Sequence, residues 1–107
     1  MDNTYRALSH PIRRRILRLL RQRAHTAGEL ADNFDIAKPT LSGHLNVLKQ
    51  AELVTVDRQG TTLTYRLNMS VAEELIENLL ALLGVEAATD LQVSLTEEIE
   101  TKEEKDG

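Results

Sequence analysis

The sequence predicts a mostly helical α+β domain, with about five helices and one β-hairpin. Through most of the first 84 residues, apolar side chains recur at helical spacing, whereas residues 53–67 switch to the alternation of paired strands. The hairpin directly follows two helical segments that are separated by only about three or four residues. A helix, a tight turn, a second helix and a hairpin form the order of a winged helix-turn-helix.

Composition excludes several classes of protein. The 107 residues contain no cysteine, which rules out disulfides, thiolate metal sites and thiol redox switches. Apolar residues make up 41% of the chain but only three are aromatic, so the core must be mainly aliphatic. No apolar run is long enough to cross a bilayer, and no signal segment precedes the first helix. We therefore expect a soluble cytoplasmic protein without stable membrane association and without a cofactor.

Charge is segregated along the chain, so the net charge of −4 misleads. Residues 1–84 carry eleven Lys/Arg and nine Asp/Glu, whereas residues 85–107 carry two and eight. We predict one folded domain over residues 1–84 and an acidic, partly disordered tail over residues 85–107. The mildly basic domain is compatible with a polyanionic partner.

Two helices are expected before the turn region. Residues 2–8 form the first, with Tyr5 and Leu8 on one side. The second begins at Ser9 as N-cap, with Pro11 in its first turn and four aliphatic residues at helical spacing. Five arginines between them are expected to face solvent, and we assign one or two of them to phosphate contact: Arg13, Arg14, Arg15, Arg18 and Arg21.

The next two helices flank the turn. Thr26 and Glu29 have the spacing of a capping box, which starts a short helix. Pro39 suits the first turn of the helix over residues 38–50. The hairpin then follows, with a glycine-containing turn at 57–62 that places Arg58 and Gln59 at its tip.

The helix over residues 38–50 has an unusual outward face. At 100° per residue, three leucines define the buried side, and Gly43 lies at the centre of the opposite side. No acidic residue occurs in this helix, and its outward side chains are hydroxyls and amides, which suit the DNA major groove. The candidate DNA-binding residues are Lys38, Pro39, Thr40, Ser42, Gly43, His44, Asn46, Lys49, Arg58 and Gln59.

A last helix is predicted over residues 70–83, from a capping box of Ser70 and Glu73 to Gly84 as the C-terminal stop. Its apolar surface is wider than one domain can cover. A second copy of the chain is the simplest partner. The candidate dimer-interface residues are Tyr5, Leu8, Leu75, Leu79, Leu82 and Leu83.

The segments "ALSHPIRRRILRLL", "TAGELADNFDIAKPTLSGHLNVLKQAELV" and "DRQGTTLTYRLN" resemble the ArsR/SmtB family of winged-helix repressors, in particular its SdpR-type autorepressor branch. The resemblance covers roughly residues 3–84. It implies a homodimer through the first and last helices, a recognition helix at 38–50 and a wing at 57–62. It also implies repression of transcription at an inverted-repeat operator.

The sequence departs from metal-sensing relatives in this family. The stretch "TAGELADNF" has no cysteine, and the last helix has no histidine. His10, His25 and His44 lie on three separate elements, so we expect no metal site, with His25 as a surface turn residue and His44 near the DNA. Many relatives have serine at the position of Ala37, which is a poor helix cap, so Asp35 or a shifted helix start would have to substitute.

The sequence leaves three functional interpretations open, and a DNA-binding repressor is the first of them. No nucleophile, phosphate loop or paired carboxylates support an enzyme. A winged-helix module that binds protein instead of DNA is the main rival to a repressor. A third possibility is a repressor that senses a small molecule at the dimer interface. The operator, the regulated genes and any regulatory protein partner do not follow from the sequence.

Overall fold

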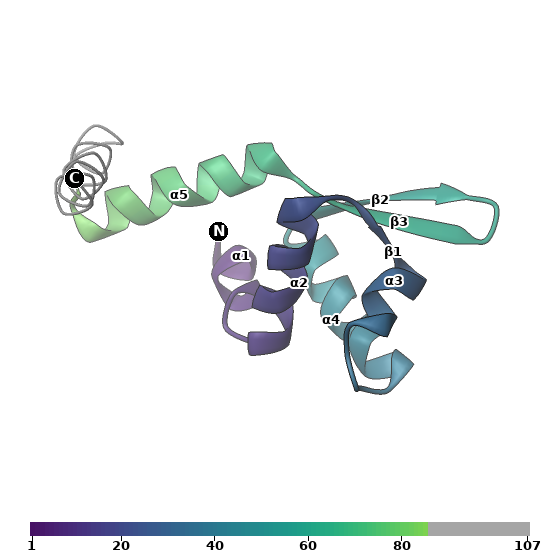
Figure 1. The fold of residues 1–107 in the computed structure, drawn as a ribbon. Helices are drawn as coiled ribbons and strands as arrows, with labels where there is room; N and C mark the ends of the chain where they lie inside the picture. The colour runs from purple at the N-terminus through teal and green to yellow at the C-terminus, as the bar shows by residue number, and fades with distance from the viewer. Residues whose placement is uncertain (86–107) are drawn as a thin grey trace, which may run out of the picture. The chain divides into compact units, whose positions relative to one another are not determined.

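The structure, a computed structural model, describes residues 1–85, and the chain divides into two compact units, residues 1–72 and 73–107. The predicted tail therefore lies almost entirely outside the described residues. The first unit contains four helices and three strands (Figure 1), namely α1 (Asp2–Ala7), α2 (Pro11–Gln22), β1 (His25–Thr26), α3 (Ala27–Asp32), α4 (Lys38–Gln50), β2 (Val54–Gln59) and β3 (Thr62–Leu67). Helix α5 (Met69–Leu83) begins in the first unit and continues into the second. The predicted winged helix-turn-helix is confirmed.

The sheet has one strand more than the sequence predicts. β2 and β3 form the expected antiparallel hairpin, and β1 pairs with the other edge of β3. His25 in β1 lies opposite Tyr65 and is only 4% exposed, so its assignment to a surface turn is wrong. A strand of two residues is too short to show an alternating pattern in the sequence. It becomes a strand only because it pairs with β3. At the hairpin turn Gly60 has φ +61°, which a side chain would disfavour.

The core is aliphatic, as composition predicts. Its largest fully buried members are Ile16 of α2, Leu30 of α3, Leu48 of α4 and Leu53 after α4. Helix α4 packs against α1, α2 and β2 (Figure 1). Its leucines at positions 41, 45 and 48 are at most 5% exposed, which confirms the buried side of the helix and fixes which face remains outside.

Two helix starts differ from their predictions. His10, not Ser9, caps α2, because its Nδ1 accepts the backbone N–H of Ile12 at 3.1 Å. The Ser9 hydroxyl instead donates to the carbonyl of Arg6 at 2.7 Å and closes the end of α1. Helix α5 starts at Met69, ahead of the predicted cap Ser70, and the preceding Asn68 side chain accepts the N–H of residue 71 at 3.5 Å.

Helices α4 and α5 are each followed by a residue in the left-handed conformation. At the end of α5, Gly84 has φ +75° and Val85 N–H bonds to the carbonyl of Leu80 at 2.9 Å, as the predicted glycine stop requires. At the end of α4 the same geometry falls on Glu52, with φ +62°, and Leu53 N–H bonds back into the helix at 3.1 Å. A glutamate in this conformation carries local strain that a glycine would not.

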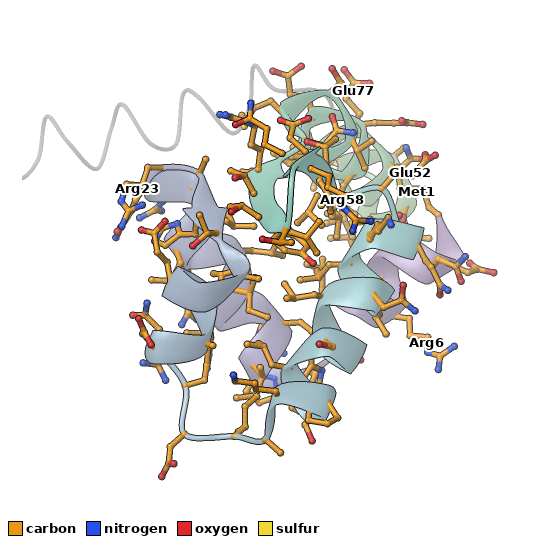
Figure 2. The ribbon with its side chains drawn as sticks, turned by 90° about the vertical axis from the view of Figure 1, so that its right-hand side faces the viewer. Met1, Arg6, Arg23, Glu52, Arg58 and Glu77 are labelled. Carbon is orange, nitrogen blue, oxygen red and sulfur yellow. The ribbon has the colours of Figure 1, made fainter. Side chains whose placement is uncertain are left out.

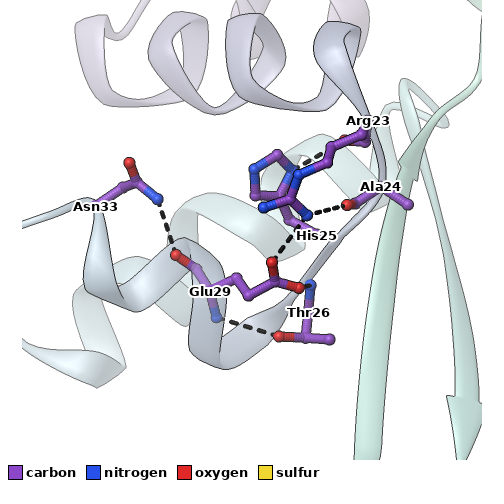
Figure 3. A network of polar contacts seen from close by, with 6 residues as sticks. All are labelled: Arg23, Ala24, His25, Thr26, Glu29 and Asn33. Carbon is purple, nitrogen blue, oxygen red and sulfur yellow. Dashed lines mark hydrogen bonds and ion pairs between the residues drawn. The ribbon is translucent and has the colours of Figure 1, made fainter.

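The start of α3 is held by the predicted capping box (Figure 3). Glu29 N–H donates to the Thr26 hydroxyl and Thr26 N–H donates to the Glu29 carboxylate, both at 3.1 Å. Arg23 adds an ion pair to Glu29 at 2.8 Å. The pKa of Glu29 is lowered, chiefly by the Thr26 backbone donor and next by Arg23. Its stabilising contribution is therefore present above the ordinary glutamate pKa and is lost as the pH falls below it.

Candidate nucleic-acid interface

The outward face of α4 is exposed, small and free of acids. Gly43 lies in its middle, and a Cβ added there would meet nothing within 4 Å. Amide and hydroxyl groups surround this open position, with one lysine near each end of the helix. The exposed residues of this face, which we call the α4 face, are Lys38, Pro39, Thr40, Ser42, Gly43, Asn46, Lys49 and Gln50.

The beginning of α4 has no side-chain cap. Ala37 occupies the N-cap position and makes no capping hydrogen bond, so neither Asp35 nor a shifted start replaces the missing serine. The first N–H groups of a helix need an acceptor from outside the helix. An anion such as a phosphate oxygen can supply that acceptor, and the positive end of the helix dipole favours it.

His44 lies on the side of α4 that turns inward. Its side chain is half-buried, its Nδ1 lies 3.2 Å from Nη1 of Arg13, and its ring centroid lies 4.3 Å from that of His10. Only Nε2 remains available for the predicted contact with DNA. Burial, followed by the nearby His10 and Arg13, lowers the pKa of His44.

Arg58 lies at the tip of the hairpin and belongs to no ion pair within residues 1–85. Figure 2 views the hairpin end-on, with Arg58 labelled; its Nε donates to the carbonyl of Gly60 at 3.2 Å, within the same turn. Gln59 is exposed beside it. Arg66 is paired across the strands with Asp57 at 3.2 Å, whereas Arg58 takes part in neither ion pair of the described residues. Its charge therefore stays available for an outside partner.

Four of the five arginines named on α2 are exposed, as expected, and Arg13 is the exception. Arg13 is half-buried and bonds to carbonyls at the end of α1, and Arg14 donates to the carbonyl of Leu8 at 2.8 Å. The guanidinium of Arg15 lies 4.8 Å from the centre of the Phe34 ring. Guanidinium groups satisfy the open carbonyls at a helix end, and sequence spacing cannot show which helix end lies within reach.

Two polar residues of α1 that no sequence pattern pointed to lie beside the α4 face. Asn3 and Arg6 line a shallow hollow of about 60 Å³ together with Val47 and Gln50 of α4. The Arg6 side chain is exposed and extends away from the helices (Figure 2). Arg6 is thus a candidate for phosphate contact beside the α4 face. The α1–α4 packing that places it there has no local signal in the sequence.

Most of the predicted dimer-interface residues are accessible. Tyr5 and Leu8 of α1 are half-buried, as is Leu79 of α5. Leu82 and Leu83 are 69% and 72% exposed. Two corrections apply to α5: Leu75 is already buried, at 7% exposure, and Ile76, which we did not name, is 51% exposed.

Other kinds of site have little support among the described residues. No group of three or more His, Cys, Asp or Glu in residues 1–85 is placed to hold a metal ion. No helix in that part of the chain has the length and apolar character needed to cross a membrane.

The fold and the α4 face together define a winged helix-turn-helix DNA-binding protein. A helix-turn-helix domain family matches residues 8–57. The chain is 46% identical over 76 residues to the transcriptional repressor SdpR of Bacillus subtilis, covering 71% of this chain and 84% of the relative. It is 36% identical over 79 residues to the arsenical resistance operon repressor of Staphylococcus aureus, covering 74% and 76%.

Solved structures agree with these relatives. The crystal structure of an ArsR family transcriptional regulator matches with a TM-score of 0.65 at 25% identity, over 80% of this chain and 92% of that one. The chain belongs to the ArsR/SmtB family of winged-helix, DNA-binding transcriptional repressors.

Proposed function

We propose that this protein represses transcription as a homodimer bound to an inverted-repeat operator in the cytoplasm. The observation that carries the proposal is the acid-free α4 face, with Lys38 and Lys49 near its ends. In the proposed complex this face enters the major groove, and phosphate oxygens meet the uncapped start of α4. Arg58 on the wing reaches the adjacent backbone or minor groove.

The exposed leucines of α5 support the dimer. Leu82 and Leu83 leave most of their apolar surface in water, and full burial of one such side chain is worth about 1.5–3 kcal/mol. A symmetric partner would cover this surface together with the half-buried Tyr5 and Leu8 of α1. Two α4 helices, one from each subunit, would then meet successive major grooves about 34–36 Å apart.

The regulation that we propose involves no metal. The described residues hold no suitable cluster of metal ligands, and the whole chain lacks cysteine. The 46% identity to SdpR supports repression of transcription. The resemblance to SdpR-type autorepressors leads us to propose the protein's own gene as the target, with release by a regulatory protein partner.

Salt dependence tests the DNA-binding proposal. A fluorescent duplex taken from upstream of the protein's own gene is expected to bind, and the logarithm of its affinity is expected to fall linearly with the logarithm of salt concentration, because phosphate contacts release counterions. An unrelated duplex of equal length is the control and is expected to bind more weakly at every salt concentration. Equal binding of both duplexes, or no binding at low salt, would favour a protein-interaction module instead.

A further inference from the structure

One side chain joins the end of α1 to the recognition helix. Arg13 Nε donates to the carbonyl of Ala7 at 2.8 Å, and Nη2 donates to the carbonyl of Arg6 at 3.0 Å. The remaining nitrogen, Nη1, lies 3.2 Å from Nδ1 of His44 on α4. Because α1 belongs to the proposed dimer interface, Arg13 links that interface to the DNA-contacting helix.

The contacts require both neighbouring histidines to be neutral. A guanidinium has only donors, so Nδ1 of His44 must accept from Arg13 and its proton must be on Nε2. Nδ1 of His10 likewise accepts the N–H of Ile12 at 3.1 Å. The two imidazole rings lie 4.3 Å apart, centroid to centroid, at 46°. Protonation at either Nδ1 would therefore replace an acceptor by a donor that faces another donor.

Among residues 1–85, no acidic group lies close enough to His44 to raise its pKa. Of the ionisable groups on α4 and on the elements packed against it, only His10 and Arg13 affect its pKa, and both lower it in addition to burial. The other groups on these elements are Asp2, Tyr5, Arg6, Arg14, Arg15, Arg18, Arg21, Lys38, Lys49, Asp57 and Arg58. Because its pKa lies below the ordinary 6.5, the stability gained from neutral His44 is full above pH 6.5 and falls as the pH drops.

We propose that Arg13, His10 and His44 form a positioning cluster that holds α4 in its DNA-binding orientation, and that protonation of His44 releases it. Operator affinity then falls as the pH drops below about 6.5, because the pKa of His44 lies below the ordinary histidine value. This inference rests on the proposed function, since it concerns the same helix. The direction of the change in affinity is diagnostic. Protonation of histidines elsewhere adds positive charge and therefore strengthens binding to any DNA as the pH falls.

The test compares wild type with the double variant His10→Asn, His44→Gln. Asparagine retains an acceptor suited to the N-cap, and glutamine retains one for Arg13, but neither titrates. At constant salt, wild-type operator affinity is expected to fall about threefold to tenfold between about pH 7.5 and about pH 5, because a pKa difference of up to about one unit has its full effect only below both pKa values. The variant is expected to lose this fall, and binding of either protein to an unrelated duplex is not expected to weaken.

Identical pH profiles for wild type and variant would overturn the inference while leaving the proposed function intact. Failure of the wild type to bind the operator at pH 8 would instead remove the proposed function, and the inference with it. An NMR titration of wild-type histidines provides a readout that needs no variant. Both His10 and His44 are expected as Nε2–H tautomers. The pKa of His44 is expected below that of a histidine in an unfolded peptide. An Nδ1–H tautomer at His44 would contradict the cluster.

Discussion

Replacing Gly43 by glutamate is expected to abolish operator binding while leaving the fold intact. Gly43 is exposed at the centre of the α4 face, and a Cβ there would meet no atom within 4 Å, so the monomer has room for the new side chain. Glutamate is also the better helix former. In the complex, however, its carboxylate would lie among phosphates and base edges, where negative charge is repelled. Mobility shift measures the binding, and circular dichroism checks the helix content.

Gly43→Ala is the matched control. Removing glycine from the middle of a helix should raise the free energy of unfolding by up to about 1 kcal/mol. A large loss of operator affinity in the alanine variant would mean that the backbone of α4 approaches the groove closely. Normal binding by the glutamate variant would show that the α4 face is not the DNA-contacting surface.

Replacing Leu82 and Leu83 together by glutamate is expected to convert the proposed dimer into a folded monomer. Both side chains are largely exposed in the single chain, so the change should cost little stability within one subunit. Placing two carboxylates in the apolar surface between subunits is unfavourable, because buried charges need partners. Sedimentation velocity measures the oligomeric state, and operator affinity should fall about 10²–10⁴-fold when the two α4 helices are no longer linked.

Ala81→Glu adds a charge to the same helix on a different side and serves as the control. Ala81 is exposed and lies about 100° around the helix from Leu82. This variant is expected to remain dimeric. If the double leucine variant also sediments as a dimer, α5 does not form the interface that we propose.

Local patterns predicted the main elements of this fold. The spacing of Thr26 and Glu29 predicted the start of α3, and both reciprocal bonds are present. The leucine spacing of α4 predicted which side is buried, and therefore that Gly43 faces outward. The glycine stop at residue 84 was also correct. Each of these features is decided by residues within a few positions of one another.

The errors have two sources: competition between neighbouring residues at one helix boundary, and contacts between distant segments. Ser9 is a good N-cap by type, but the end of α1 takes its hydroxyl and leaves the cap to His10. Arg13 was predicted to be one of several solvated arginines, but it bonds to carbonyls of α1 and contacts the imidazole of His44. His25 became buried because β3 pairs with it. No short-range signal encodes the contact of Arg13 with His44 or that of His25 with β3, since tertiary packing creates both.

The most direct test of a dimeric repressor is hydroxyl-radical footprinting on DNA from upstream of the protein's own gene. If a dimer binds an inverted-repeat operator, we expect two protected half-sites related by inverted symmetry. Their centres should lie about 10–10.5 base pairs apart or at a multiple of that spacing. Gly43→Glu should erase both half-sites together. A single protected half-site, or protection without inverted symmetry, would contradict the proposal that two α4 helices bind the operator as a pair.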